Sequence, residues 1–303
     1  MMTPTLCFAA HVLFLAQASS QPAAHAEQVV GPVTAVATAP AAPAERKSWL
    51  NAPDAPYQVS LHAEVGFVTP LAHTIQFSSD GTQFDYVAEG AQDNLFPLLR
   101  LSADLRLFDR HTVVLLYQPL DLQTRTLLER DVSVDGLVYP SGTPLDLRYG
   151  FTYWRLSYLF DFLPEPEAEL AIGASLQLRN ATIDFASVDG ELLRSNRDVG
   201  PVPILKARAR LPIAERYWVG AEADGFWAPI RYINGGTSDV EGAILDATVR
   251  GGLTLDAGVD AYLGLRYVGG GARGTDQSPE GPGDGYVENW IHLLALSLGF
   301  SLR

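Results

Sequence analysis

The chain has 303 residues, of which 18% are charged and 47% hydrophobic, and its formal net charge is -14. A charge this negative argues against nucleic-acid binding, which needs basic surfaces. Beyond the N-terminus, no apolar run reaches the roughly 20 residues that a membrane helix requires. The single cysteine, Cys7, lies in a segment that we expect to be removed, which excludes disulfide and thiol chemistry from the mature protein.

The N-terminal segment has the pattern of an export signal. Residues 6–16 are apolar, and after a polar stretch Ala24-His25-Ala26 precedes Glu27. An apolar segment followed by a small-x-small site is typical of a signal peptide, which we expect to span residues 1–26. Residues 27–56 are rich in Ala, Pro and Val without helical or strand periodicity, which predicts an extended linker.

Residues 57–303 repeat one pattern, in which apolar and polar residues alternate along a run. Alternate side chains of a strand point to opposite faces. In the first run, Val59, Leu61 and Ala63 share one face, and Ser60 and His62 share the other. Ten such runs are predicted to be strands: 57–69, 95–107, 112–124, 147–162, 169–180, 203–213, 217–229, 243–255, 259–268 and 288–303.

The third run is less regular than the others. It is apolar on both faces, so its alternation does not show which face turns inward. Pro119 predicts a bulge or an irregularity there, because proline cannot donate a ladder hydrogen bond.

The connections between these runs alternate strictly in length. The long connections are 70–94, 125–146, 181–202, 230–242 and 269–287, and the short ones are 108–111, 163–168, 214–216 and 256–258. Ten strands with short turns at one end and longer loops at the other are typical of single-chain membrane barrels. A soluble sandwich would not need this alternation.

The last run carries an aromatic residue near each end of its apolar face, Trp290 and Phe300, with leucines between them. It resembles the closing strand of a bacterial outer-membrane β-barrel, although Arg303 stands where those chains usually end on an aromatic residue. The resemblance implies an all-β fold: a transmembrane, antiparallel, up-and-down β-barrel of about ten strands over residues 57–303. It also implies a place in the cell outer membrane, with both termini and the 27–56 linker in the periplasm.

Two further expectations concern the outside of this barrel. The aromatic side chains expected at the membrane interfaces are Tyr57, Trp154, Tyr158, Trp227, Tyr267, Trp290 and Phe300. Three long loops contain Asp-Gly, at 80–81, 135–136 and 189–190, and Asp-Gly supplies the positive φ angles of a tight hairpin. We therefore predict extracellular β-hairpins that continue the strands above the membrane.

The inner faces carry charges of both signs on neighbouring strands. We predict a lumen ion-pair network of Arg100, Asp104, Arg106, Lys206, Arg208, Arg210, Glu222, Asp224, Asp246 and Arg250. Charges are tolerated in an interior only when they satisfy one another. A ten-strand barrel is only slightly wider than an eight-strand barrel, which its own side chains fill. We therefore expect long Arg and Glu side chains to occupy most of the lumen and to leave it largely closed.

One strand face carries the residue types of a nucleophile relay: Ser60, His62 and Glu64 lie two apart. Outer-membrane lipid A deacylases are similar in placing a His and a Ser two apart on a strand, but the order is reversed here. Because same-face neighbours also arise by chance, these three residues are weak catalytic candidates.

In size, strand number and overhanging hairpins the chain also resembles the omptin proteases. Those enzymes use an Asp pair that faces an Asp-x-His pair at the outer rim. We expect no Asp-x-His pair of this kind in the sequence, and the histidines expected on that side, His73 and His292, lack the aspartate partner. The resemblance therefore implies architecture and not protease activity.

Metal and cofactor sites are not expected. Asp276, Glu280, Asp284 and Glu288 lie in a flexible Gly- and Pro-rich loop without the ligand density of a Ca²⁺ site. The favoured function is structural or surface-interacting; a narrow channel or transporter for small solutes and a lipid- or peptide-directed hydrolase are the alternatives. The expected partners are outer-membrane lipid and, during insertion, the barrel-assembly machinery, and we expect a monomer.

Overall fold

The computed structural model describes residues 50–52, 55–163, 165, 167–229, 240–256, 258–276 and 283–303. All of them belong to one structural unit, residues 45–303. The predicted signal peptide and most of the predicted linker lie outside the described residues. No helix of the described part is long and apolar enough to cross a bilayer.

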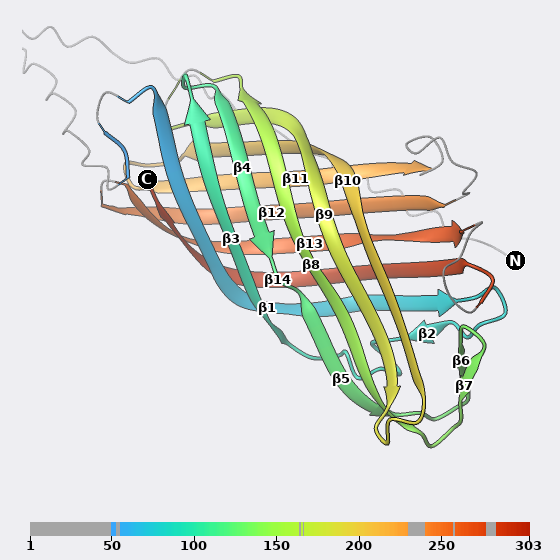
Figure 1. Ribbon diagram of the computed structural model, residues 1–303. Helices are drawn as coiled ribbons and strands as arrows, with labels where there is room; N and C mark the ends of the chain where they lie inside the picture. The colour runs from blue at the N-terminus through green and yellow to red at the C-terminus, as the bar shows by residue number, and fades with distance from the viewer. Residues whose placement is uncertain are drawn as a thin grey trace, which may run out of the picture. The chain divides into compact units, whose positions relative to one another are not determined.

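The described chain folds into a closed antiparallel sheet of ten strands (Figure 1). Each strand pairs with the next one in the wall, and β14 returns to pair with β1, so the sheet has no open edge at its base. The wall consists, in spatial order, of β1 (Tyr57–Phe77), β3 (Phe96–Leu107), β4 (His111–Gln118) continued by β5 (Asp121–Leu127), β8 (Pro144–Asp161), β9 (Glu169–Ser187), β10 (Leu193–Pro212), β11 (Tyr217–Pro229), β12 (Glu241–Asp256), β13 (Val259–Thr275) and β14 (Tyr286–Leu302). The predicted up-and-down barrel is confirmed.

Several strands extend further than predicted at the end with the long loops, here the hairpin end. β1 continues to Phe77 through a bulge between Pro70 and Ala72. A bulge accommodates a proline, which cannot donate a ladder hydrogen bond. β9 and β10 continue as a hairpin to Ser187 and Leu193. The third run breaks at Pro119 into β4 and β5, as the proline predicted.

Three small strands belong to the hairpin end. β2 (Phe84–Asp85) folds back onto β1, and β6 (Val132–Val134) pairs with β7 (Leu137–Tyr139) in a separate hairpin. Asp135 and Gly136 join β6 to β7 with φ of 46° and 73°, the predicted tight turn. The other two Asp-Gly pairs turn differently: Gly190 alone has positive φ in its pair, and neither Asp80 nor Gly81 does.

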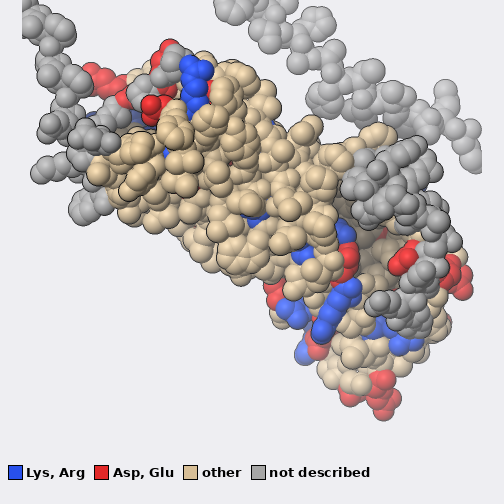
Figure 2. Space-filling view, turned by 45° about the horizontal axis from the view of Figure 1, so that its top comes forward, with Lys and Arg blue, Asp and Glu red and all other residues tan. Residues whose placement is uncertain are grey.

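The outer surface of the barrel is apolar around its middle. Outward leucines, valines and isoleucines such as Leu61, Leu156 and Leu263 are exposed on successive strands. Figure 2 shows a broad band of this surface with few charged side chains, while Lys, Arg, Asp and Glu gather toward its two ends. Water-soluble monomers do not expose a continuous apolar belt of this kind, whereas a transmembrane barrel requires one.

Neighbouring strands part at two places toward the hairpin end. Pairing between β3 and β4 stops at Leu101 and Tyr117, and pairing between β10 and β11 stops at Leu205 and Gly225. The first seam is covered, because Thr124 and Thr126 of β5 donate hydrogen bonds to backbone carbonyls in the 84–92 segment. At the second seam, no described residue pairs with the part of β10 before Leu205 on the side that faces β11.

Candidate functional site

The interior next to the short turns is a layer of charged side chains. Glu64 of β1 and Arg100 of β3 are directly paired in register, and Arg100 Nη1 lies 2.8 Å from Glu64 Oε1. The same guanidinium reaches across the lumen, where Nη2 lies 2.9 Å from Glu222 Oε1 of β11. A single buried side chain therefore links opposite walls of the barrel.

Glu222 is the centre of this layer. It accepts Lys206 Nζ at 2.6 Å and Arg250 Nη1 at 3.0 Å in addition to Arg100. Lys206 also contacts Asp224, and Arg250 also contacts Glu64. Glu222 therefore has direct partners from β3, β10 and β12, and Arg250 links it to Glu64 of β1. These charges compensate one another away from solvent.

A second group closes the layer toward the hairpin end. Arg155 of β8 crosses to Asp224 at 2.9 Å and Asp246 at 3.0 Å. Arg266 of β13 contacts Asp246 at 2.6 Å and donates to Gln118 and to the Tyr153 hydroxyl. Both guanidiniums are buried, and their nitrogens have protein acceptors.

All ten residues predicted for the network lie on the inner face and make ion pairs. Besides the pairs above, Arg208 contacts Asp104 and Glu169, Arg106 contacts Asp161, and Arg210 contacts Asp260. The predicted set omitted further members of the layer: Glu64, Arg155, Asp161, Glu169, Asp260, Arg266 and Arg303. Each of them occupies a position that alternation along the run places on the inner face, and this pattern could have identified them.

The half of the interior nearer the hairpins is apolar, which differs from the expectation that charges fill most of the lumen. Inward residues of the wall, including Leu122, Leu147 and Phe185, pack against Phe84 and Tyr86 from the connection after β1. The β6–β7 hairpin adds Val132, Val134 and Tyr139 to this cluster. The Tyr139 hydroxyl donates to the Phe185 carbonyl at 2.8 Å, and burial raises the pKa of Tyr139 to about 12. We call this cluster the apolar plug.

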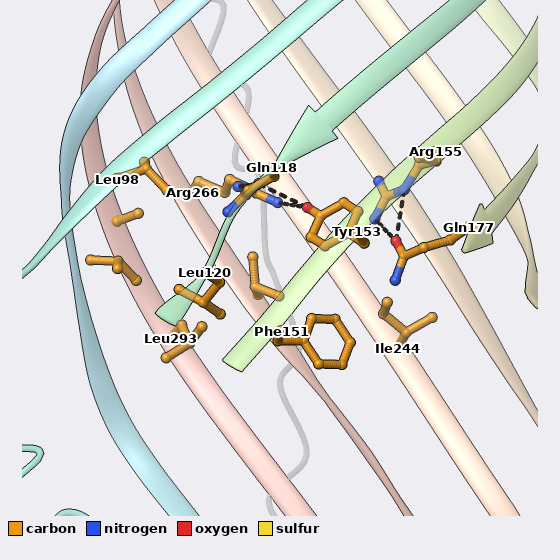
Figure 3. A pocket seen from close by; sticks show the side chains of 13 residues that line it. Leu98, Gln118, Leu120, Phe151, Tyr153, Arg155, Gln177, Ile244, Arg266 and Leu293 are labelled. Carbon is orange, nitrogen blue, oxygen red and sulfur yellow. Dashed lines mark hydrogen bonds between the residues drawn. The ribbon is translucent and has the colours of Figure 1, made fainter. Parts of the chain in front are cut away.

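A small cavity of about 30 Å³ separates the two layers. Figure 3 shows the polar side chains of Gln118, Tyr153, Arg155, Gln177 and Arg266 along one side of it and Leu120, Phe151, Ile244 and Leu293 along the other. A cavity of this size holds one or two water molecules. Buried ion pairs and the apolar plug therefore occupy successive levels of the interior.

The three weak catalytic candidates do not form a relay. His62 Nε2 lies 3.6 Å from Asp104 Oδ1. Glu64 is occupied by Arg100, Arg250 and the hydroxyls of Tyr262 and Ser297. No hydrogen bond of the described residues joins Ser60 to His62 or His62 to Glu64, so the structure brings the three together on one face without the geometry of a nucleophile and its base.

The two histidines expected near the outer rim, His73 and His292, contact tyrosine rings or hydroxyls. His73 is buried in the apolar plug, stacked on Tyr86 at 4.3 Å, and its Nδ1 lies 2.8 Å from Gln92 Oε1. His292 lies on the outer surface, 2.6 Å from the Tyr267 hydroxyl. The chain does contain one Asp-x-His, Asp109-Arg110-His111, but it lies at the short turn before β4, opposite the rim used by omptins.

No group of three or more potential ligands that could hold a metal ion occurs among the described residues. Of the acidic loop after β13, Asp284 accepts hydrogen bonds from Ser79, and Glu288 accepts one from Tyr286. Glu280 lies outside the described residues.

The seven predicted interface aromatics lie on the outward side of the wall. Tyr57, Tyr158 and Phe300 lie toward the short turns, and Trp154, Trp227, Tyr267 and Trp290 toward the hairpins. Trp154 contacts Tyr117 of the neighbouring strand at 4.5 Å between ring centroids. Two levels of aromatic side chains around an apolar belt are typical of a barrel that spans a membrane.

No family model matches this chain, and no curated protein matches it. Among solved structures, the outer membrane protease OmpT from Escherichia coli is similar with a TM-score of 0.46 and 10% identity, over 80% of this chain and 96% of that one. The transport unit of the autotransporter AIDA-I from Escherichia coli gives 0.41 and 9% over 81% and 90%, and Neisserial surface protein A gives 0.32 and 12% over 82% and 98%. These scores are too low to support an argument, so the assignment to the transmembrane β-barrels rests on the closed ten-strand sheet and its apolar exterior.

Proposed function

We propose that this protein is a closed outer-membrane barrel that presents an ordered surface at its hairpin end and does not conduct solutes. The observation that carries the proposal is the doubly blocked lumen. Arg155 and Arg266 place buried, fully paired guanidiniums in the lumen, and the apolar plug lies on the other side of the small cavity. A permeation path would have to break both layers.

The hairpin end carries an extended sheet, which we call the ledge. β5, β8, β9 and β10 continue above the aromatic level as a four-stranded sheet. Its inner face packs on the apolar plug, whereas its outer face carries the ion pairs Arg125–Asp146 and Arg148–Asp121. A sheet with one apolar and one polar face is stable in water, which suits a surface that meets other molecules.

The proposed orientation places the short turns and both termini in the periplasm and the hairpins outside the cell. It is supported by the alternation of short and long connections and by the export pattern of residues 1–26. Outer-membrane lipid would then surround the belt, with the barrel-assembly machinery acting during insertion. The closed wall and the belt around it favour a monomer.

Conductance in planar lipid bilayers tests the closed lumen. The unaltered barrel is expected to show no steady openings. A variant with Arg155→Ala and Arg266→Ala that also lacks residues 129–142 loses the two crossing guanidiniums and the β6–β7 part of the apolar plug, and we expect it to conduct more than the unaltered barrel under the same conditions. Steady openings of the unaltered barrel would contradict the proposal and favour a narrow channel.

Labelling of single cysteines tests the orientation. Gln123→Cys, on the ledge, is expected to react with a membrane-impermeant maleimide on intact cells. Glu215→Cys, on a short turn, is expected to react only after the outer membrane is permeabilised. The reverse pattern would invert the orientation.

A further inference from the structure

The short-turn end of the barrel contains a cavity of about 150 Å³, which we call the vestibule. Its lining includes the guanidiniums of Arg106, Arg208, Arg210, Arg250 and Arg303. Carboxylates also line it: Asp104, Glu169 and Glu222 in the wall and Glu167 on the turn before β9. The function proposed above does not use this space.

In one corner of the vestibule two guanidiniums converge on one carboxylate. Arg210 Nη2 lies 2.8 Å from Asp260 Oδ2, and Arg303 Nη2 lies 2.9 Å from the same oxygen. Asp260 also accepts hydrogen bonds from the hydroxyls of Thr254 and Ser301. Two guanidinium side chains therefore share one carboxylate side chain, and that carboxylate has little capacity left.

The positive groups of this corner face the cavity, and the negative group does not. The Arg210 and Arg303 side chains are 22% and 28% exposed, whereas Asp260 is 0% exposed. The Trp218 ring, 4.0 Å from the Arg210 guanidinium carbon, covers one face of that group and leaves its edge available. Of the described hydrogen bonds, those donated by these two guanidiniums all use Nη2.

The neighbouring guanidinium, that of Arg208, has more carboxylate partners than the guanidiniums of the corner. Arg208 contacts two carboxylates, Asp104 and Glu169, so that part of the vestibule has no surplus of positive charge. Compared with Arg208, Arg210 and Arg303 therefore have fewer carboxylate side chains in contact with them.

We propose that this corner binds a small oxyanion, a phosphate or a small carboxylate, between the edges of Arg210 and Arg303. A guanidinium edge offers two parallel N–H donors that match two oxygens of a carboxylate or phosphate. Partial burial strengthens such contacts relative to bulk water. The vestibule admits an ion of that size with several waters but not an extended polymer.

Isothermal titration of inorganic phosphate into the detergent-solubilised barrel tests the proposal. Sodium chloride holds the ionic strength constant, and no phospholipid is present. We expect saturable binding to the unaltered protein and at least about tenfold weaker binding to Arg303→Gln and to the double variant Arg210→Gln, Arg303→Gln. Arg125→Gln, which removes a guanidinium from the ledge, is expected to bind as the unaltered protein does.

Two controls separate loss of binding from loss of fold. The heat-dependent gel mobility of each variant reports an intact barrel. The fluorescence of Trp218, which stacks on Arg210, should respond to phosphate in the unaltered protein and not in Trp218→Phe. Absence of saturable binding to the unaltered barrel, or equal affinity in folded Arg303→Gln and Arg125→Gln, would overturn the proposal.

A last comparison identifies the source of the anion. Phosphate is titrated into nanodiscs of phosphatidylcholine and into nanodiscs that contain phosphatidylglycerol. Competition from phosphatidylglycerol would assign the site to a lipid headgroup, and equal affinity in the two would assign it to a soluble anion.

Discussion

At the scale of single residues, Glu222 shows how the interior tolerates so many charges. It accepts contacts from Arg100, Lys206 and Arg250, which come from three different strands. Removing such a carboxylate leaves several cations buried without compensation, and that loss costs far more than a surface ion pair contributes.

We therefore expect Glu222→Ala to destabilise the barrel by about 3–5 kcal/mol. Urea unfolding in lipid vesicles measures the change. Asp146→Asn breaks the exposed pair with Arg125 on the ledge and should leave the unfolding midpoint unchanged. Equal effects of the two substitutions would mean that the charged layer does not stabilise the lumen.

The ion pair between Glu89 and Arg130 makes the hairpin end sensitive to acid. Arg130 Nε lies 2.7 Å from Glu89 Oε2, and this hydrogen bond lowers the pKa of Glu89 below its ordinary value of 4.5. A lowered pKa means that the pair stabilises the fold above that ordinary value and that the contribution disappears as pH falls through the lowered one.

Amide hydrogen exchange of the 84–92 segment should therefore accelerate below about pH 4.5, relative to β11 in the same sample. Glu89→Gln should give faster exchange at neutral pH and remove the acid-dependent part. An identical acid response in Glu89→Gln would assign the sensitivity to another group.

At the scale of elements, the prolines of β10 account for the parting of β10 and β11. Pairing with β9 continues through Pro201 and Pro203, whereas pairing with β11 stops at Leu205. Proline has no N–H to donate to a neighbouring strand, so two prolines in alternate positions remove consecutive donors from one edge.

Replacing Pro203 by Val should extend the β10–β11 ladder, because it restores a donor and removes the ring. The expected result is at least about tenfold slower amide exchange at Phe226 and Trp227. Leu205→Val, within the part already paired, is the matched control and should change nothing there. Unchanged exchange in Pro203→Val would show that another feature separates the strands.

At the scale of the whole molecule, the barrel has two apolar regions with different purposes. The outward belt, with residues such as Leu61 and Leu263, faces lipid, and the apolar plug is shielded from both lipid and water. The backbones of the wall strands separate the two regions. Leucines and other apolar residues therefore form both the lipid-facing surface and the internal core of this chain.

Leu263, in the middle of β13 and 61% exposed, tests the lipid-facing belt. Leu263→Arg is expected to cost about 2–4 kcal/mol of unfolding free energy in lipid vesicles, because a charge near the bilayer midplane is poorly solvated. Leu127→Arg, at the end of β5 above the belt, should have little effect. Equal tolerance of both would mean that the belt does not meet acyl chains.

The sequence alone determined the wall of this barrel. Most strands have one continuous apolar face, and the dyad pattern of β1, β8 and β14 is local, so it can be read without knowing the fold. Closure, strand number and the break at Pro119 followed from that pattern and from the alternation of connection lengths. The inward parity of Arg155 and Arg266 was equally readable, although neither was placed in the network.

Only the tertiary structure decided what fills the barrel. The contact of Arg100 with Glu222 and that of Arg155 with Asp246 join strands far apart in sequence, and closure of the sheet brings them together. The apolar plug depends on Phe84, Tyr86 and the β6–β7 hairpin folding inward from connections whose alternation is too short to show a direction. Strand patterns specify which face a residue is on, but contacts across a lumen depend on shear and loop packing, which no single strand encodes.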